Sequence, residues 1–246
     1  MTPMRKFKAE LHVHTVLSPC AGVEMIPPLI VRAALEQRIN LIAITDHNAS
    51  ANVGAVIRAA EDTSLHVLPG MELQTQEDVH LLCLFDTLQQ VETWQQRVNQ
   101  LLPDTPNNIE YFGEQFVVDH EGEFIRREER LLINSARIEL QHAISEVTAL
   151  GGLALPAHVD RKANGLFEIL GVLPPGIGAV EISRHISPVA AVQKYPQLKN
   201  HPLLQSGDVH YLDDFLGSSA FFMEAPTISE IRQALFAQNG RSTQIG

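Results

Sequence analysis

Two short motifs near opposite ends of the sequence pair residue types that bind metal ions. His12 and His14 are two positions apart in Phe7–His14, which has the composition of a strand, and alternate residues of a strand project from the same face. Asp208 and His210 repeat this spacing after a second predicted strand. Imidazole is the commonest metal ligand in proteins. Either motif alone could be an ordinary surface pair, but each also predicts half of a metal site.

Four further segments place a histidine or a carboxylate beside a predicted strand. They are Asp46-His47 after LIAIT, Glu72 after VLPGM, His158 after LALPA, and His80 at the start of VHLLCLF. Parallel barrels collect ligand-binding residues at the carboxyl ends of their strands, so the recurrence predicts one shared site. His80 does not fit this rule, because it begins its strand. The histidines without such a placement are His66, His120, His142 and His201, and His185, which follows the strand-end Glu181, is a candidate substrate contact.

The elements that must position these residues alternate between short apolar runs and longer helical patterns. This alternation is typical of βα units in a parallel sheet or barrel. The predicted strands are Phe7–His14, Asn40–Asp46, Leu65–Leu68 leading into Met71–Leu73, Val79–Phe85, Gly152–Pro156, Ala179–Ser183, Leu203–Ser206 and Ser219–Glu224. The predicted helices are Pro27–Arg38, about Ala51–Glu61 and about Ile228–Gln238, the last opened by a capping box of Thr227 and Glu230.

The alternation breaks between about residues 87 and 134. A helical pattern over Val91–Leu102 is followed by a proline-containing loop and by a hairpin pattern over Phe116–Arg126, around His120-Glu121-Gly122. This is too much substructure for a loop. We expect an insertion or small arm on a single domain that spans residues 1–246.

Composition excludes some classes of protein and disfavours others. A chain of 246 residues with 45% hydrophobic residues can bury a sizeable core, which excludes a disordered chain. The 18 basic and 29 acidic residues give a net charge of −11, which disfavours a protein that coats nucleic acid or an anionic membrane. The two cysteines form no Cys-x-x-Cys pair, and no stretch has the pattern of a signal peptide or a membrane span. We therefore expect a cytoplasmic protein that makes no membrane contact.

Six motifs occur in an order and at spacings that resemble the PHP (polymerase and histidinol phosphatase) family of metal-dependent phosphoesterases. They are the His-x-His-Thr of ELHVHT, the Thr-Asp-His of ITDHN, the Gly-Met-Glu of PGMEL, the His of VHLLCL, the Ala-His-x-x-Arg of AHVDR and the Asp-x-His of SGDVH. The resemblance implies a distorted (β/α)7 barrel with two or three divalent metal ions at its mouth. It implies that the ligands are His12, His14, His47, Glu72, His80, His158, Asp208 and His210, with Glu72 bridging metals. Asp46 is then expected to orient a ligand imidazole.

One motif departs from the family pattern. Family members commonly continue with Ser-Asp-Gly, whose Asp is a ligand, whereas this sequence has Ser18-Pro19-Cys20, which resembles a Ser-Pro-Cys branch of the family. Proline cannot ligate, so Cys20, Glu24 or a water is expected to fill the position. A thiolate would favour zinc, whereas the carboxylate of Glu24 would preserve the family's metal preference, so Glu24 joins the predicted ligands.

Imidazole and carboxylate ligands without clustered thiolates suit Mn, Fe or Zn. Such ions clamp a phosphoryl group and lower the pKa of a bound water to about 7. The first interpretation is therefore a phosphatase or phosphodiesterase that acts on a small phosphorylated molecule, nucleotides included. Arg161 and His210 are the expected catalytic residues, and Arg161, Arg184 and His185 are expected to bind the substrate. Two alternatives are a nuclease acting on short oligonucleotides and a non-catalytic metal-binding module. A nuclease would require a basic groove with aromatic side chains on which bases stack.

Overall fold

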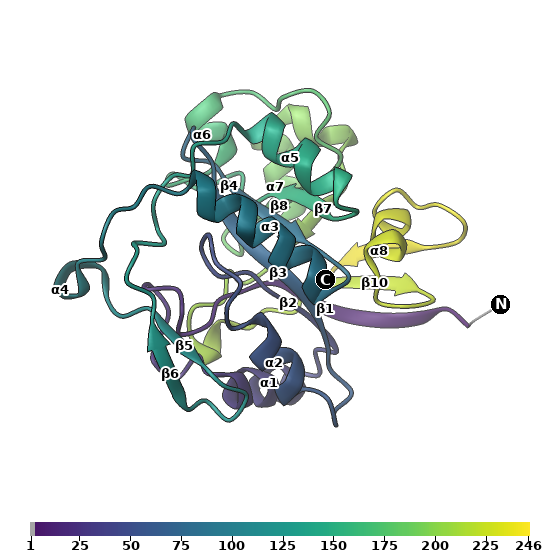
Figure 1. Ribbon diagram of the computed structural model, residues 1–246. Coiled ribbons are helices and arrows are strands. Elements are labelled where there is room, and N and C mark those ends of the chain that lie inside the picture. The colour runs from purple at the N-terminus through teal and green to yellow at the C-terminus, as the bar shows by residue number, and fades with distance from the viewer. Residues whose placement is uncertain (1–2) are drawn as a thin grey trace.

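The computed structural model describes residues 3–246, and a curled seven-stranded sheet forms its centre (Figure 1). The strands lie in the order β11-β10-β1-β2-β3-β4-β7. Their bounds are β1 Arg5–Val13, β2 Leu41–Ile44, β3 His66–Gln74, β4 His80–Leu84, β7 Leu153–Pro156, β10 Ser219–Met223 and β11 Ser242–Ile245. Strands β8 (Val180–Ile182) and β9 (Leu203–Gln205) form a separate parallel pair next to β7. The fold is therefore α/β, as the sequence predicted.

The sheet is mixed, so the parallel pairing predicted from the βα alternation holds in it only for β1, β2 and β3, and the distorted (β/α)7 barrel stays a prediction. Strands β1, β2 and β3 are parallel, whereas β4 is antiparallel to β3 and to β7, and β10 is antiparallel to β1 and β11. Only residues 75–79 separate β3 from β4, and a parallel return requires a crossover of a dozen or more residues. Strand β4 therefore turns straight back, and it begins at the edge where β3 ends.

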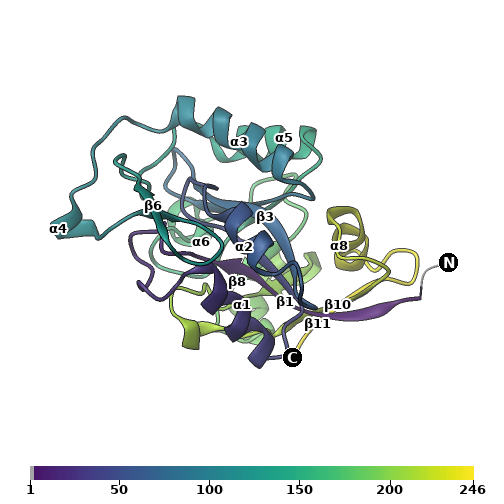
Figure 2. The same cartoon turned by 60° about the horizontal axis from the view of Figure 1, so that its bottom comes forward.

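Helices pack against this sheet (Figures 1 and 2). Helix α2 (Val53–Ala59) contacts α1 (Pro27–Glu36) and β3, α3 (Leu88–Leu101) contacts β3, α5 (Leu140–Ala149) contacts β7, and α8 (Ile228–Leu235) contacts β10. Strand β2 serves two clusters: Ile42 and Ile44 pack with α1 and α2, and Leu41 and Ala43 pack in the cluster that includes α8. Burial on both faces explains its continuous apolar sequence. Among the described residues, no helix combines the length and apolarity needed to cross a membrane.

The segment from residue 87 to 134 contains α3, α4 (Ile109–Phe112) and a hairpin of β5 (Phe116–Val118) and β6 (Phe124–Arg127). The hairpin was predicted from the sequence and is confirmed. Helix α3 begins with a capping box between Thr87 and Gln90, and its Trp94 is fully buried in the same cluster as residues of β3 and β4. The hairpin and α4 lie at the edge of the molecule (Figure 1). The assignment of the whole segment as an insertion stays a prediction.

Short helices complete the chain between β7 and β10. They are α6 (Leu166–Leu170), α7 (Pro188–Lys194) and the 3-10 helices η1 (Pro196–Asn200) and η2 (Leu212–Asp214). The capping box predicted at the start of α8 forms in part. Thr227 accepts from the backbone N–H of Glu230 at 3.3 Å, but the Glu230 carboxylate accepts from the N–H of Glu224 instead of returning to Thr227.

Candidate metal centre

The carboxylate of Glu72 lies among five buried histidines. Its Oε1 is 2.8 Å from Nδ1 of His80. The same oxygen is 3.2 Å from Nε2 of His12 and 3.2 Å from Nε2 of His158. One carboxylate oxygen therefore gathers three imidazoles from three separate strands or strand ends.

The second oxygen of Glu72 faces a different pair of histidines. Its Oε2 is 2.9 Å from Nδ1 of His47 and 3.4 Å from Nε2 of His14. Asp208 lies on the far side of His14, with its Oδ1 3.4 Å from Nε2 of His14 and 3.2 Å from Nε2 of His12. The two carboxylates thus share the imidazoles of the first motif.

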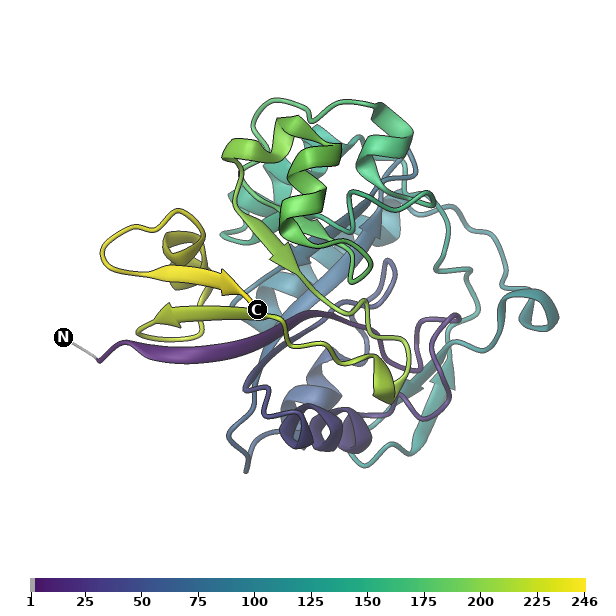
Figure 3. The ribbon, with the colours of Figure 1, turned by 180° about the vertical axis from the view of Figure 1, so that it is seen from behind.

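Strand direction explains why these side chains meet. His80 begins β4, and because β4 is antiparallel to β3, this start lies at the edge where the parallel strands end. The segment that carries Asp208 and His210 runs beside the end of β1 (Figure 3), where the N–H of Val209 donates to the carbonyl of His12 at 2.9 Å. His80, which did not fit a parallel sheet, is therefore well placed in this mixed one.

Glu181 positions two of the predicted ligands and was not assigned a role from the sequence. Its Oε1 is 2.9 Å from Nδ1 of His12 and accepts from the backbone N–H of His158 at 3.1 Å. Burial lowers the pKa of His12, but Glu72 and Glu181 outweigh that effect and raise this pKa well above its ordinary value. The contact leaves Nε2 of His12 free to face the cluster. In the sequence, the one sign of this role was that Glu181 is an acidic residue at the end of a predicted strand.

Ser18 connects the second histidine of the first motif to Asp46. Its Oγ is 2.9 Å from Nδ1 of His14, accepts from the backbone N–H of His47 at 3.2 Å, and donates to Oδ1 of Asp46 at 2.7 Å. Asp46 also accepts from the N–H and hydroxyl of Thr15. Asp46 was expected to orient an imidazole, and in the structure it reaches His14 through the Ser18 hydroxyl.

The outer rim of the cluster combines a cation, a thiol and His210. Arg161 forms an ion pair with Asp208, and its side chain is 42% exposed. His210 stacks on His14 with ring centroids 4.1 Å apart, and its Nε2 lies 3.1 Å from Sγ of Cys20. Burial raises the pKa of the Cys20 thiol, but the histidines beside it outweigh burial and lower this pKa to about 6.

The electrostatic environment favours the ligating protonation state for two carboxylates and two histidines of the cluster, whereas the pKa values of His12, His47 and His210 are raised, because neighbouring acidic groups outweigh burial. Burial alone would raise the pKa of Glu72, but the surrounding histidines, His80 foremost, hold this pKa well below its usual range. Asp208 is affected in the same way beside His12. Burial lowers the pKa of His14 well below its usual value and that of His80 to about 4. Ionised carboxylates and neutral imidazoles are the forms that ligate.

Three residues at or beside the cluster have a left-handed backbone conformation. His158 has φ of 26° and Asp208 has φ of 53°, and Asn48, which follows His47, has φ of 49°. Residues other than glycine rarely adopt this left-handed region. Such strain is characteristic of functional sites, where the surrounding structure holds side chains in a required position.

The donor set fits divalent metal ions. Three overlapping groups bring ligand atoms within 4.8 Å of one another: His12, His14 and Asp208; His14, His47 and His210; and His47, Glu72 and His80. The buried Nδ1 of His47 and Oε2 of Glu72 lie 2.9 Å apart, but neither makes a hydrogen bond of acceptable geometry. An unpaired buried polar atom costs about 1–3 kcal/mol, and a bound cation would satisfy both atoms.

A family comparison agrees with this arrangement. Residues 10–173 match the model of the PHP domain. The chain belongs to the PHP domain family. No curated protein matches the sequence.

Solved structures with the same fold as this PHP domain include nucleases and phosphoesterases. The lesion-specific endonuclease PfuEndoQ from Pyrococcus furiosus superposes with a TM-score of 0.71 at 19% identity, over 97% of this chain and 58% of that protein. An Endonuclease Q complex with a 27-mer duplex carrying an abasic lesion gives 0.71 at 18% identity, with the same coverage. A Bifidobacterium adolescentis protein described as a metal-dependent phosphoesterase gives 0.56 at 17% identity, over 82% of this chain and 87% of that one. The chain thus spans 58% of the length of these endonucleases.

The structure brings together eight of the nine ligands predicted for this PHP domain, all except Glu24. Glu24 is half-buried and belongs to none of the three groups, and its carboxylate folds back over Gly22. Of the two side chains proposed to replace the missing ligand, it is Cys20 that contacts a cluster histidine. The role of Glu24 as a ligand stays a prediction. The remaining histidines, His66, His120, His142, His185 and His201, also lie outside the three groups.

Two cavities meet at the metal centre. A cavity of about 350 Å³ is lined by six of the predicted ligands, namely His47, Glu72, His80, His158, Asp208 and His210, together with Cys20, Gln74, Ile133, Arg161 and Asn164. A wider one, of about 540 Å³, is lined on its far side by the predicted substrate contacts Arg184 and His185. The two cavities share Cys20, Arg161, Asp208 and His210.

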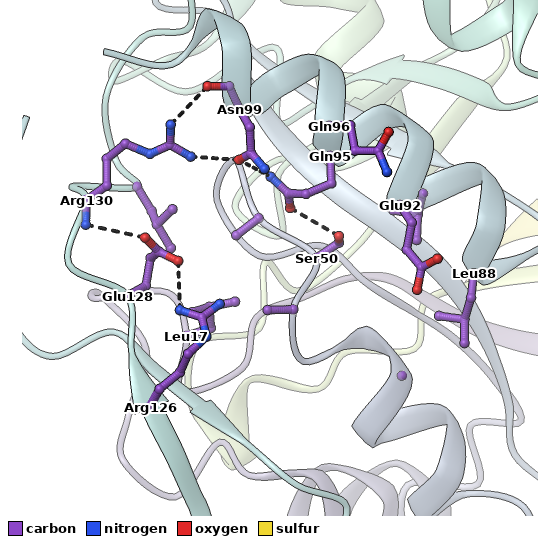
Figure 4. A pocket seen from close by; sticks show the side chains of 15 residues that line it. Leu17, Ser50, Leu88, Glu92, Gln95, Gln96, Asn99, Arg126, Glu128 and Arg130 are labelled. Atoms are coloured by element: carbon purple, nitrogen blue, oxygen red, sulfur yellow. Dashed lines mark hydrogen bonds and ion pairs between the residues drawn. The ribbon is translucent and has the colours of Figure 1, made fainter. Parts of the chain in front are cut away.

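A third cavity, of about 420 Å³, lies between α3 and the segment after the hairpin (Figure 4). Six of its polar side chains form hydrogen bonds or ion pairs with one another, namely Ser50, Gln95, Asn99, Arg126, Glu128 and Arg130. Ser50 donates to Gln95 at 3.1 Å, and Arg130 donates to Oδ1 of Asn99 at 2.7 Å. It shares no lining residue with the two cavities at the metal centre.

Proposed function

We propose that this PHP domain is a metal-dependent phosphoesterase that hydrolyses a phosphate ester of a small molecule or nucleotide. The observation that carries the proposal is Glu72, whose two oxygens face separate histidines in a cavity that also contains the guanidinium of Arg161. A carboxylate placed in this way can bridge two cations. An arginine beside them can hold the oxygens of a phosphoryl group.

The residues that would hold two or three ions are those of the cluster. They are His12, His14, His47, Glu72, His80, His158, Asp208 and His210. Mn, Fe and Zn all suit this donor set. Divalent ions bound there would supply a water nucleophile at neutral pH and neutralise charge on the phosphoryl group.

The protein's own residues orient the ligands and the substrate. Glu181 and Ser18 fix the Nδ1 sides of His12 and His14, so that both Nε2 atoms face the carboxylates of Glu72 and Asp208. Arg161 is partly exposed and lies where the two cavities join. It can therefore exchange its contact with Asp208 for a phosphate oxygen, and His210 lines the same junction as the second predicted catalytic residue.

A nuclease acting on short oligonucleotides is the second candidate. Endonuclease Q, which has the same fold, was solved with a DNA duplex that carries an abasic lesion at its active site. The metal chemistry would be identical. Against this candidate stands the net charge of −11, because phosphate-rich partners favour basic surfaces.

The test measures metal content and hydrolysis together. Purified protein, supplied with Mn, Fe or Zn, is assayed on a panel of phosphomonoesters, dinucleotides and single-stranded oligonucleotides. We expect hydrolysis of at least one class, and we expect His12→Ala to abolish it with a loss of bound metal. His142→Ala is the matched control, because His142 is an exposed histidine of α5 outside the cluster. Full turnover and metal content in His12→Ala would refute the proposal.

A further inference from the structure

The wider cavity continues directly from the metal centre and is built from a different set of residues. Beyond the four residues shared with the narrower cavity, it is lined by Ser183, Arg184, His185, Gly207, Tyr211 and Asp214. Its volume of about 540 Å³ lies within the range of about 300–1,000 Å³ typical of small-molecule sites. The narrower cavity is lined by the predicted ligands, so it would hold the ions and the phosphoryl group. The wider one is then the space left for the rest of a substrate.

Tyr211 places an aromatic ring in this cavity, directly after the predicted ligand His210. It is 54% exposed, so its ring is open to contact with a ligand in the cavity. Its backbone, in contrast, is held firmly. The N–H of Tyr211 donates to Oδ2 of Asp214 at 3.0 Å, and its carbonyl accepts from the N–H of Asp214 at 2.9 Å.

Asp214 is itself braced from across the cavity. Nη1 of Arg184 donates to its carbonyl oxygen at 3.1 Å and to its Oδ1 at 2.9 Å. Its Oδ2 also accepts from the N–H of His210 at 3.3 Å. A side chain at Gly207 would collide with the carbonyl of Asp214, so the approach of the two segments requires glycine there. The turn that presents Tyr211 is thus fixed relative to the metal centre.

An exposed ring on a fixed turn suits a flat aromatic ligand. Each nucleobase has a π-face that stacks on an aromatic side chain, and Arg184 and His185 supply polar groups in the same cavity. We propose that the wider cavity binds the nucleoside part of a phosphorylated nucleoside and that Tyr211 stacks on its base. This inference rests on the proposed phosphoesterase function, since it places the phosphate beside Arg161 at the junction of the two cavities.

The third cavity offers no comparable site for this group. Most of the polar side chains that line it are engaged with one another (Figure 4), and Arg126 pairs with Glu128 at 3.0 Å. It also shares no residue with the metal centre.

The experiment compares two substrates that differ only in the base. We would measure kcat/KM for AMP and for ribose 5-phosphate, and report their ratio for wild type, Tyr211→Ala and Tyr211→Phe. Loss of base stacking should lower the ratio about tenfold in Tyr211→Ala, and Tyr211→Phe should keep the wild-type ratio. Tyr111→Ala is the matched control, because Tyr111 is 79% exposed on α4, away from the cavity. Metal content confirms that each variant retains its site.

A second measurement separates this inference from the proposed function. Binding of AMP and of single-stranded pentathymidylate to the Mn-supplied protein is followed by calorimetry, which needs no turnover. If AMP binds and Tyr211→Ala weakens binding about tenfold while no substrate is hydrolysed, the inference stands and the proposed function fails. If Tyr211→Ala weakens the binding of pentathymidylate but not that of AMP, the inference is supported and the cavity is assigned to the terminal nucleotide of a strand. Equal ratios and equal affinities in wild type and Tyr211→Ala, or no binding of either probe to wild type, would overturn the inference.

Discussion

Glu181 is the residue whose replacement best tests how the metal centre is positioned. Both of its hydrogen bonds, to Nδ1 of His12 and to the N–H of His158, use the same oxygen, Oε1. The other oxygen, Oε2, is buried and has no hydrogen-bond partner. Glu181→Gln can therefore keep both contacts through its amide oxygen while removing the negative charge. Glu181→Ala removes the charge and both contacts.

The two variants should separate charge from geometry. Replacing a residue that orients a metal ligand typically weakens metal binding about 10–100-fold, which corresponds to about 1.4–2.7 kcal/mol, and we expect a loss in this range for Glu181→Gln. In Glu181→Ala, two buried donors lose their acceptor at about 1–3 kcal/mol each. Its free energy of unfolding without metal should therefore lie about 2–6 kcal/mol below that of Glu181→Gln.

Metal affinity is measured by competition with a chromophoric chelator, and stability by urea unfolding in EDTA. Glu168→Gln makes the same chemical change on an exposed position of α6 and should match wild type in both assays. Wild-type metal affinity in Glu181→Gln would show that the carboxylate does not tune His12. Equal stabilities of Glu181→Gln and Glu181→Ala would show that the two hydrogen bonds contribute nothing.

Arg161 and Glu10 yield two further predictions. Arg161→Ala should lower kcat/KM by the equivalent of about 2.7–4 kcal/mol, the range for a lost transition-state donor, and should leave the metal content unchanged. Arg58→Ala is the control, because Arg58 is an exposed arginine of α2. Unchanged kinetics in Arg161→Ala would contradict its role in holding phosphate. Burial raises the pKa of Glu10, and the backbone N–H groups of Gly217, Gly207 and Leu216, which donate to its carboxylate, lower it. Burial has the larger effect, so the pKa is about 7. Because this folded-state pKa exceeds its ordinary value of 4.5, the contribution to stability is present at low pH and is lost as pH rises through about 7. The free energy of unfolding of wild type relative to Glu10→Gln, measured by urea in EDTA, should fall by about 3 kcal/mol between about pH 5 and 8; parallel pH curves would refute it.

The predicted ligands came from local sequence patterns because metal binding makes local demands. Two residues that ligate from one strand end must be two positions apart, so His12 with His14 and Asp208 with His210 were visible without a structure. The continuous apolar run of β2 also predicted a strand that is buried on both faces, as Ile42 and Leu41 show. In these cases the chemistry and the geometry depend on neighbours in the chain.

The tertiary structure alone decided what depends on residues far apart in the chain. The antiparallel direction of β4 follows from pairing with β3 and β7, and it brings His80 to the metal centre. The partners of Glu181 and Ser18 lie 169 and 28 residues away, in His12 and Asp46. No local pattern distinguishes these two from other acidic residues or serines at strand ends and loops. Nor could spacing choose between Glu24 and Cys20: the fold of their loop places the Cys20 thiol beside His210 and turns the Glu24 carboxylate onto Gly22.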